Sequence, residues 1–595
     1  MGKLRLVLLR EIPEDENLRR QWNALVDRVD QPQVFYTYEW ALAVGRAYSA
    51  TLRPLLFLAY DEGEPESLCG VAALATDSSE REASFLCATT GDYCDFLSLL
   101  ERKPALVDAV VAELRKKGIY RAAFANLAAD STTVAAIRQA ARQHRYFSFT
   151  RTGYVCAQVS LSQLERRKEG KPVAPGGKRL RHLVNAMAST APVRFDHVRS
   201  WEALQPILPE FMQAHVARFL EIGRISNLAH PTRQRFLTEL AKLLSEKQWL
   251  VLSRLITGDQ TVAWHYGFRF RGTWFWYQPT FDSRVERFWP GFCLLTQVIQ
   301  EAAEDPAMKT LDLGLGSEAY KAKFANASRE TLYVTLHSSI FRHLGSVLWD
   351  RTAAVVKTHP AAEKFAEAVR GRIKLLRERT GRQGPTQTVV WVAKQLMRRL
   401  WTRDEVLFYE WQGCPAALPV SGDVKLHPLA LEQLAKAASA YADDSETLTY
   451  LLRSTRRLRE GTAEAFALVD AGGTPLHFAW VTGFTGFFLA ELNTKVEAAC
   501  PEAVLLFDCW TPVAARGHGH YSSAIRQIAN QVRGEGKRPW IFSAATNAAS
   551  VRGIEKAGFQ RRYSLVRQRV FNQQRVKGQP PFSQGAGPAE VSASV

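Results

Sequence analysis

The chain has 595 residues, of which 46% are hydrophobic and 23% are charged. This length is too great for a single hydrophobic core, so we expect several structural units of ordinary globular composition. We find no run of about 18 apolar residues that predicts a transmembrane helix. The alternating residues before Glu11 and Glu14 favour a first strand over a signal peptide.

The formal charge of +18 predicts an anionic partner, such as coenzyme A (CoA), membrane lipid, nucleic acid or an acidic polymer. The excess is concentrated, because residues 342–403 carry fourteen Lys or Arg against four Asp or Glu. Within this stretch, the apolar residues of 389–403 fall on one side of a helix and Lys or Arg residues stand beside them, which is typical of an amphipathic helix. Such a helix either lies on anionic lipid or packs between domains.

Eight cysteines occur and none forms a CxxC pair. Their apolar surroundings predict reduced thiols and a cytoplasmic protein. His518 and His520 flank one glycine, which is not a usual zinc-ligand spacing, and we expect no metal site.

The most informative stretch lies near the C-terminus, where an apolar strand at 503–510 leads into a glycine turn and then a helix. The turn is the run Arg516-Gly517-His518-Gly519-His520-Tyr521, and apolar residues follow it at helical spacing. Glycines allow a ligand to approach the backbone, and the unpaired N–H groups of a helix start attract anions. The turn therefore predicts a site for a diphosphate group, and we expect the main-chain N–H groups of all six residues to contribute.

Together with a second segment, this turn resembles the two motifs of the GNAT acyltransferase superfamily. Arg516 and Gly519 fit the first motif. The second motif corresponds to Asn547-Ala548-Ala549-Ser550, ending in Lys556 and Gly558-Phe559. The resemblance implies binding of acetyl-CoA or another acyl-CoA, with Asn547 and Ser550 placed near the pantetheine arm.

The chain departs from the GNAT pattern at two positions. Tyr521 stands where the first motif has a small residue, and Ile554 stands where the second often has a tyrosine that acts as general acid. If the resemblance holds, the leaving thiolate takes its proton from elsewhere, for example from water or Tyr563. Glu491 and Asp508, at expected strand positions, are candidate bases that act through water, and salt bridges to arginine are the alternative.

A second stretch at 249–323 predicts a three-strand meander, a helix that begins at Pro290-Gly291, and a further strand at 310–315. Its residues resemble the CelD-type acetyltransferase family associated with bacterial cellulose and exopolysaccharide biosynthesis. The resemblance rests on Gln278-Pro279, Phe281-Asp282, Pro290-Gly291, Asp312-Leu313-Gly314 and Tyr320-Lys321. It implies a phosphate turn at Pro290 and Gly291, with Asp282, Tyr320 and Lys321 as candidate catalytic residues. Capping by Asp282 and packing by Tyr320 are the alternatives.

Residues upstream, including Gly91-Asp92-Tyr93-Cys94-Asp95, resemble the first half of the same family. We therefore expect an α/β (α+β) protein with mixed GNAT-like sheets flanked by helices. The expected parts are a degenerate lobe at 1–160, a basic mobile loop at 161–190, a second lobe at 191–340, a basic helical linker at 341–400, a second GNAT domain at 401–575 and a disordered tail at 576–595.

The sequence thus predicts a cytoplasmic acyltransferase that transfers an acyl group from acyl-CoA to an amine or hydroxyl, with a sugar or exopolysaccharide precursor implied by the family resemblance. Residues 341–403 either contact an anionic membrane at its inner face or pack between the domains, and no DNA partner is expected. Two alternatives remain open. One is a noncatalytic membrane-surface adaptor, and the other is an aminoacyl-tRNA-dependent peptidyltransferase.

Overall fold

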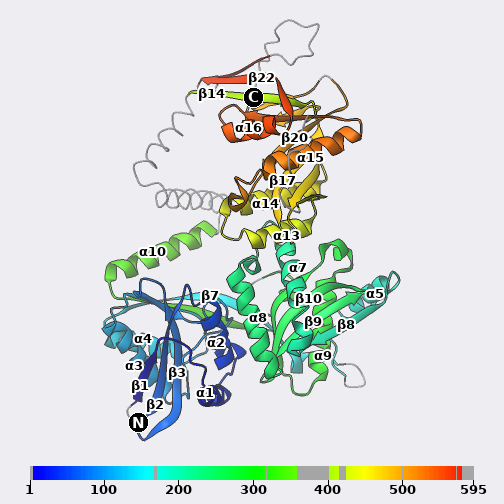
Figure 1. Ribbon diagram of the computed structural model, residues 1–595. Helices are drawn as coiled ribbons and strands as arrows, with labels where there is room; N and C mark the ends of the chain where they lie inside the picture. The colour runs from blue at the N-terminus through cyan, green and yellow to red at the C-terminus, as the bar shows by residue number, and fades with distance from the viewer. Residues whose placement is uncertain are drawn as a thin grey trace. The chain divides into compact units, whose positions relative to one another are not determined.

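The structure is a computed structural model that describes residues 4–166, 171–316, 318–357, 401–413, 424–498, 500–570 and 573–578. The chain forms two compact units. Unit 1 comprises Met1–Arg218 and His230–Val355, and unit 2 comprises Phe219–Ala229 and Val356–Val595. Each unit contains a large mixed sheet with helices packed on it (Figure 1), as expected for the α/β class.

The sheet of unit 1 has thirteen strands among the described residues, in the order β1-β2-β3-β4-β6-β13-β7-β12-β11-β10-β9-β8, with β5 beside β3. The strands are β1 (Leu4–Leu9), β2 (Arg53–Asp61), β3 (Glu64–Thr76), β4 (Glu82–Phe85), β5 (Leu97–Ser98), β6 (Arg121–Ala128), β7 (Phe147–Ser160), β8 (Val193–Val198), β9 (Leu250–Thr257), β10 (Gln260–Phe270), β11 (Thr273–Phe281), β12 (Thr310–Asp312) and β13 (Ala327–His337).

Two long strands join the two lobes of unit 1 into one sheet. Strand β13 pairs with β6 of the first lobe and with β7, and β7 pairs in turn with β12 of the second lobe. Figure 1 shows β7 running between the lobes. The chain therefore returns to the first lobe after it completes the second, and residues far apart in the sequence meet at the junction.

Helices cover both lobes. They are α1 (Glu16–Arg28), α2 (Tyr38–Ala47), α3 (Lys103–Lys116), α4 (Thr133–Gln143), α5 (Gly177–Ala188), α6 (Trp201–Leu204), α7 (Leu208–Glu221, whose last residues are counted with unit 2), α8 (Pro231–Glu246), α9 (Pro290–Glu304) and α10 (Ile340–Lys357). The expected meander is present as β9, β10 and β11, and it precedes α9 as predicted.

Helix α5 corrects part of the expected mobile loop at 161–190. Leu180 and Met187 are buried on one side of this helix, with Leu183 and Val184 partly buried beside them. They pack on the same core as α9, which includes Leu294, Val298 and Ile299. The basic residues of this segment mask a helical apolar spacing, and burial of that apolar side stabilises a helix where charge and glycine suggested a loop.

Unit 2 has an eight-stranded sheet in the order β15-β16-β17-β20-β21-β14-β22-β23 and a separate hairpin of β18 and β19. The strands are β14 (Trp401–Trp411), β15 (Lys425–Pro428), β16 (Glu464–Val469), β17 (Pro475–Gly483), β18 (Phe487–Leu489), β19 (Thr494–Val496), β20 (Ala503–Trp510), β21 (Arg538–Ala544), β22 (Phe559–Val570) and β23 (Gln573–Lys577). The helices described are α13 (Leu431–Ala440), α14 (Ser445–Glu460), α15 (His520–Gly534) and α16 (Ala548–Lys556).

Two hydrophobic clusters fill unit 2. One includes Ile525 and Ile528 of α15 and Ile554 of α16, and the other includes Phe408 and Trp540. The helical spacing that predicted α15 is thus the spacing of its buried side.

Most of the predicted basic helix at 389–403 and of the predicted disordered tail at 576–595 lies outside the described residues. Of that tail, Val576 and Lys577 belong instead to β23, and Gly578 follows them. The described end of that predicted helix, Trp401–Arg403, belongs instead to β14 and pairs with Val570–Gln568 of β22. Backbone pairing with β22 favours a strand here over the helix that the amphipathic pattern predicted.

Candidate functional site

A cavity of about 700 Å³ lies in unit 2 where two neighbouring strands separate. Strands β20 and β21 pair in parallel only from Ala503–Leu506 to Arg538–Ile541, so their later residues diverge. The starts of α15 and α16 complete the wall. This volume is within the range of small-molecule and cofactor sites.

Most of the residues predicted for unit 2 line this cavity. Those that do are Glu491, Asp508, Arg516, Gly517, Gly519, His520, Tyr521, Asn547 and Ser550. His518 is not among the lining residues, and its ring lies 5.8 Å from that of His520. The turn and the second segment, which are separated in sequence, therefore meet at one cavity.

The start of α15 presents unpaired backbone N–H groups. Gly519 is its N-cap, with φ of 80°, and makes no side-chain capping hydrogen bond. Gly517 also has a positive φ, of 87°, and a Cβ built on either glycine meets nothing within 4 Å. The backbone conformation, not lack of space, therefore requires glycine here. A helix start without a side-chain cap attracts an anion.

Strand β20 carries a bulge that places Asp508 beside the cavity. The pairing with β17 shifts register between Phe478 and Trp480, and Asp508 has φ of 46°. Its carboxylate accepts a hydrogen bond from Arg457 Nη1 at 2.7 Å, and Arg453 lies 3.8 Å away. Asp508 is thus held as an ion pair. Glu491 is exposed in the turn between β18 and β19, not on the expected strand.

Tyr521 fills the space between α15 and α16. A Cβ built on Gly553 lies 2.5 Å from Tyr521 Cδ1, and the Tyr521 hydroxyl is 3.0 Å from Ser550 Oγ. Burial raises the pKa of Tyr521, so its hydroxyl stays protonated. The large side chain at a position that is small in the GNAT motif is accommodated because α16 has a glycine opposite it.

The second segment has a structural role as well as a place in the cavity wall. Asn547 caps α16, because its side chain accepts a hydrogen bond from Ser550 N at 3.1 Å. Ile554 is fully buried in the core. Tyr563 packs against the other hydrophobic cluster, with its ring stacked 4.6 Å from Phe408, and does not line the cavity.

His477 is a cavity residue that the sequence reasoning missed. Its Nδ1 lies 2.8 Å from Thr511 Oγ1, and its buried Nε2 has no hydrogen-bond partner. Burial is the main cause that lowers the pKa of His477, to about 3, so the ring is neutral at physiological pH. His477 lies on β17, and the apolar residues around it predict only a buried strand. The sequence therefore gave no indication that His477 lines a cavity.

In unit 1 the corresponding strand separation lies between β11 and β12, which pair only through Thr273–Phe275 and Thr310–Asp312. Helix α9 begins at Pro290, and a Cβ built on Gly291 lies 3.1 Å from the Phe281 ring.

Two of the three candidate catalytic residues of this lobe, Asp282 and Lys321, form ion pairs. Asp282 caps the 3-10 turn Ser283–Phe288 and pairs with Arg284 at 2.8 Å. Lys321 is buried, donates to Leu315 O at 2.7 Å and pairs with Glu318 at 2.9 Å. Tyr320 is partly exposed, and burial of its hydroxyl raises its pKa.

A pair of carboxylates at the junction of the two lobes was not predicted as a site. The hydroxyl of Tyr93 donates to Asp312 Oδ2 at 2.8 Å. Asp92 lies beside Gly314, because a Cβ added to this glycine would be 2.7 Å from Asp92 Oδ2. Burial, and then the Asp312 carboxylate, raise the pKa of Asp92 to about 7 against the opposing effect of Lys321. A carboxyl with this pKa suits general acid–base chemistry. Asp92 and Asp312 both belong to the motifs on which the family resemblance rests, and these motifs were the only indication of this pair in the sequence.

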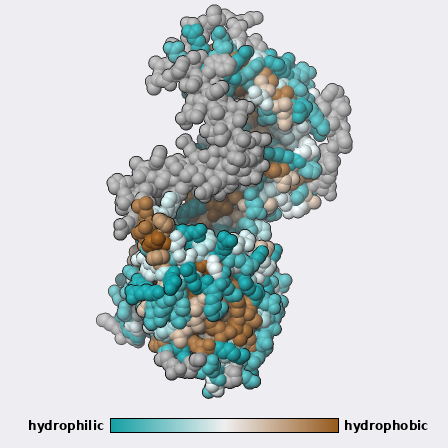
Figure 2. All heavy atoms as spheres, turned by 90° about the vertical axis from the view of Figure 1, so that its left-hand side faces the viewer, coloured by the Kyte–Doolittle hydropathy of each residue, from teal (hydrophilic) through white to brown (hydrophobic). Residues whose placement is uncertain are grey.

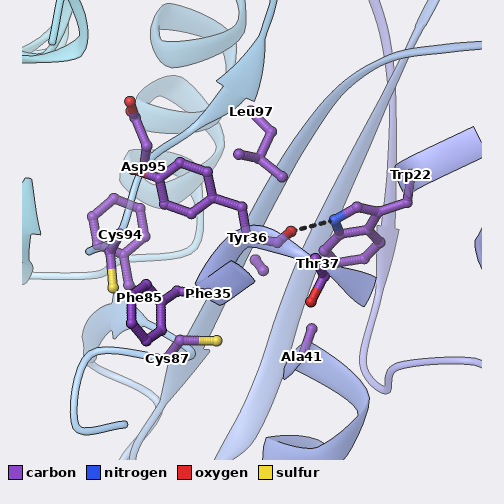
Figure 3. A pocket seen from close by; sticks show the side chains of 11 residues that line it. Trp22, Phe35, Tyr36, Thr37, Ala41, Phe85, Cys87, Cys94, Asp95 and Leu97 are labelled. Atoms are coloured by element: carbon purple, nitrogen blue, oxygen red, sulfur yellow. Dashed lines mark hydrogen bonds between the residues drawn. The ribbon is translucent and has the colours of Figure 1, made fainter. Parts of the chain in front are cut away.

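The first lobe encloses a smaller space. The cavity among Trp22, Tyr36 and Cys94 has a volume of about 30 Å³, and Trp22 Nε1 donates to Tyr36 O at 2.8 Å across one side of it (Figure 3). This space holds a few water molecules at most and is far too small for CoA.

No group of three or more His, Cys, Asp or Glu residues among the described residues is placed to hold a metal ion. None of the described helices combines the length and hydropathy needed to cross a membrane.

Residues 177–322 match the family model described as Acetyltransferase (GNAT) domain. The match runs from α5 to Lys321-Ala322, so the second lobe of unit 1 is similar in sequence to GNAT acetyltransferase domains. The comparison with curated proteins finds no significant match.

Solved structures resemble the chain at low identity. The C-terminal domain of a putative lysylphosphatidylglycerol synthetase from Agrobacterium fabrum is 14% identical, with 56% of this chain and 94% of that chain covered and a TM-score of 0.35. L-PGS from Bacillus licheniformis is 12% identical, with coverages of 58% and 98% and a TM-score of 0.38. A tandem GNAT protein from the clavulanic acid biosynthesis pathway is 11% identical, with coverages of 56% and 98% and a TM-score of 0.33. At these scores the likeness defines no activity.

Proposed function

We propose that this protein is an acyl-CoA-dependent acyltransferase whose donor site is the cavity of unit 2. The observation that supports this proposal is the meeting, at one cavity of about 700 Å³, of diverging parallel strands and the uncapped start of α15. The N–H groups at Gly519 and His520 bind the diphosphate, and the gap between β20 and β21 takes the pantetheine arm.

The acceptor is an amine or hydroxyl, and a sugar or exopolysaccharide precursor is the class that the CelD-type resemblance implies. Attack on the thioester carbonyl needs a base and an oxyanion donor. Of the two candidate carboxylates, exposed Glu491 is free of the ion pair that engages Asp508, so we assign the base to Glu491 acting through water. Neutral His477 can donate a hydrogen bond from Nε2 to the developing oxyanion. Ile554 has no proton to give and Tyr563 does not line the cavity, so the leaving CoA thiolate takes its proton from water.

Calorimetric titration with CoA tests the donor site. Gly519→Glu adds a negative charge and a side chain at φ of 80°, so we expect CoA affinity to fall at least tenfold. Gly534→Glu, at the other end of α15 and also in open space, is the matched control and should bind as the wild type does. Failure of the wild-type protein to bind CoA, or equal binding by both variants, would contradict this donor site.

A noncatalytic adaptor at a membrane surface is the second candidate, and the replacement of a general acid by buried Ile554 favours it. Both candidates place the protein at the inner face of a membrane, which it contacts through residues 341–403. Release of free thiol from acetyl-CoA separates the two, because an adaptor releases none. An aminoacyl-tRNA-dependent peptidyltransferase, suggested by the double lobe and the charge of +18, predicts tRNA that co-purifies with the chain.

A further inference from the structure

Two histidines stand at the start of α15, beside the cavity of unit 2. His520 is the first residue of the helix and lines the cavity, and His518 precedes the N-cap, Gly519. Their rings lie 5.8 Å apart, with an angle of 23° between the ring planes. Figure 2 shows that hydrophilic residues form much of the described surface, and His518 is an exposed residue of this kind, whereas His520 is half-buried. The His520 ring therefore belongs to the cavity wall more than to the open surface.

The surroundings of the His520 ring disfavour a positive charge on it. Burial is the main cause that lowers the pKa of His520, and the neighbouring His518 is the second. No carboxylate in the described part of the chain lies close enough to oppose this effect. A charge on His520 also lowers the pKa of His477, which lines the same cavity, so the two rings are near each other. The imidazolium form of His520 thus has no anionic partner within the protein.

The other charged or titratable residues that line the cavity are Glu491, Asp508, Cys509, Arg516 and Tyr521. Asp508 is paired with Arg457, and burial raises the pKa of Cys509 and of Tyr521, so these two groups stay protonated. Arg516 donates from Nε to Thr511 O at 3.0 Å and keeps its charge at every pH of interest. His520, in contrast, is a cavity residue whose charge can change near neutral pH.

A separate observation on the same wall points to a polar ligand. His477 is only 1% exposed, and its buried Nε2 has no hydrogen-bond partner. The contact of its Nδ1 with Thr511 Oγ1, at 2.8 Å, fixes the ring beside the chain that leads into the glycine turn. Buried polar atoms are nearly always paired in folded proteins, so an unpaired one on a cavity wall indicates a polar group that binds there.

We propose that the His520 ring binds the diphosphate of CoA as a cation, so that the protein takes up a proton when CoA binds. This inference rests on the proposed donor site in unit 2 and adds a side chain to its main-chain N–H groups. The diphosphate supplies the anionic partner that the protein lacks, and a charge-assisted hydrogen bond to it favours the imidazolium. Because the pKa of His520 is then higher in the complex than in the free protein, affinity is greatest at low pH and falls as pH rises.

Calorimetric titration of the full-length chain with dephospho-CoA tests the proposal. This ligand has the diphosphate but lacks the 3′-phosphate, so the ligand itself does not titrate near neutral pH. Titrations at pH 6.5 in two buffers of different ionisation enthalpy give the number of protons taken up. We expect about half a proton for each ligand bound, and binding about fivefold tighter at pH 6 than at pH 8.

Two variants of His520 separate a binding role from a structural one. His520→Gln should bind without proton uptake and with the same affinity at pH 6 and pH 8. His520→Arg keeps a positive charge at both values, so it should bind more tightly than the wild type at pH 8, again without proton uptake. The matched control is His427→Gln, at an exposed position of β15 outside the cavity, which should take up protons as the wild type does.

The proposal is overturned if the wild type binds dephospho-CoA without taking up a proton, or if the uptake persists in His520→Gln. It is also overturned if His520→Arg binds no more tightly than His520→Gln at pH 8. In each of these cases the donor site in unit 2 still stands, because the ligand binds. If the wild type does not bind dephospho-CoA at all, the donor site itself is wrong and this inference fails with it.

Discussion

Asp92 and Asp508 are both aspartates beside a strand separation, and their neighbours give them different properties. Asp508 pairs with Arg457, which keeps its charge compensated. Asp92 faces the carboxylate of Asp312 in a largely buried place, and its pKa rises to about 7. An aspartate side chain thus forms an ion pair in unit 2, whereas in unit 1 another aspartate titrates near neutral pH.

The raised pKa of Asp92 predicts a pH dependence of stability. Between the ordinary value near 3.8 and the folded value near 7, the folded protein holds a proton that the unfolded chain has lost. Stability therefore falls as pH rises through this range, and the whole loss is present above pH 7. Asp92→Asn removes the charge, and we expect it to stabilise unit 1 at pH 8 by about 1–2 kcal/mol, a value reduced for partial exposure.

The measurement is urea unfolding at pH 5 and pH 8, with Asp259→Asn, an exposed carboxylate in the turn between β9 and β10, as the control. The control should show no gain at pH 8. An Asp92→Asn variant that is less stable than the wild type at pH 8 would show that the Asp92 carboxylate is stabilised as an anion.

At the scale of elements, the junction of α15 and α16 shapes the cavity of unit 2. Tyr521 packs on Gly553 and contacts Ser550, so the two helix starts are held together on the cavity wall. Alanine favours a helix over glycine by about 1 kcal/mol. At position 553, however, the Tyr521 ring occupies the space that an alanine Cβ needs, so the steric cost exceeds the gain in helix propensity.

We expect Gly553→Ala to destabilise unit 2 by about 1–2 kcal/mol net, because overpacking costs more than helix propensity returns. Tyr521→Ala is destabilising by itself, but in that background Gly553→Ala should cost little or nothing, because the space is vacant. Thermal unfolding of the two single variants and the double variant measures the coupling. Additive effects in this cycle would mean that the two side chains do not share the space.

At the scale of the whole molecule, each unit has a hydrophobic core of its own. Separate cores predict separate unfolding transitions, and a ligand that binds one unit should raise the transition temperature of that unit alone. Scanning calorimetry with excess CoA should therefore shift the transition of unit 2. If the transition of unit 1 moves instead, the donor site lies in the lobe that matches the GNAT family.

Which transition belongs to unit 2 can be assigned with Gly553→Ala, because the substitution lies in α16 and should lower only that transition. Its use here does not depend on CoA binding. A single cooperative transition for the whole chain would contradict independent cores.

Much of the local structure was predictable. The meander of β9, β10 and β11, the start of α9 at Pro290, and the strand, turn and helix around Gly519 all follow the expected pattern. Periodicity failed where charge obscured it, as in α5, and where backbone pairing outweighed it, as at Trp401–Arg403. These are the places where tertiary packing competes with local preference.

Local sequence was sufficient to predict the strand, glycine turn and helix around Gly519, because turns and helix starts are set by neighbouring residues. The contacts of the polar groups, in contrast, follow from how distant parts of the chain pack together. The pairing of Asp508 with Arg457, the packing of Tyr521 on Gly553 and the approach of Asp92 to Asp312 each join residues distant along the chain. Such contacts depend on how the sheets and helices pack, and packing is not encoded in any single stretch of residues.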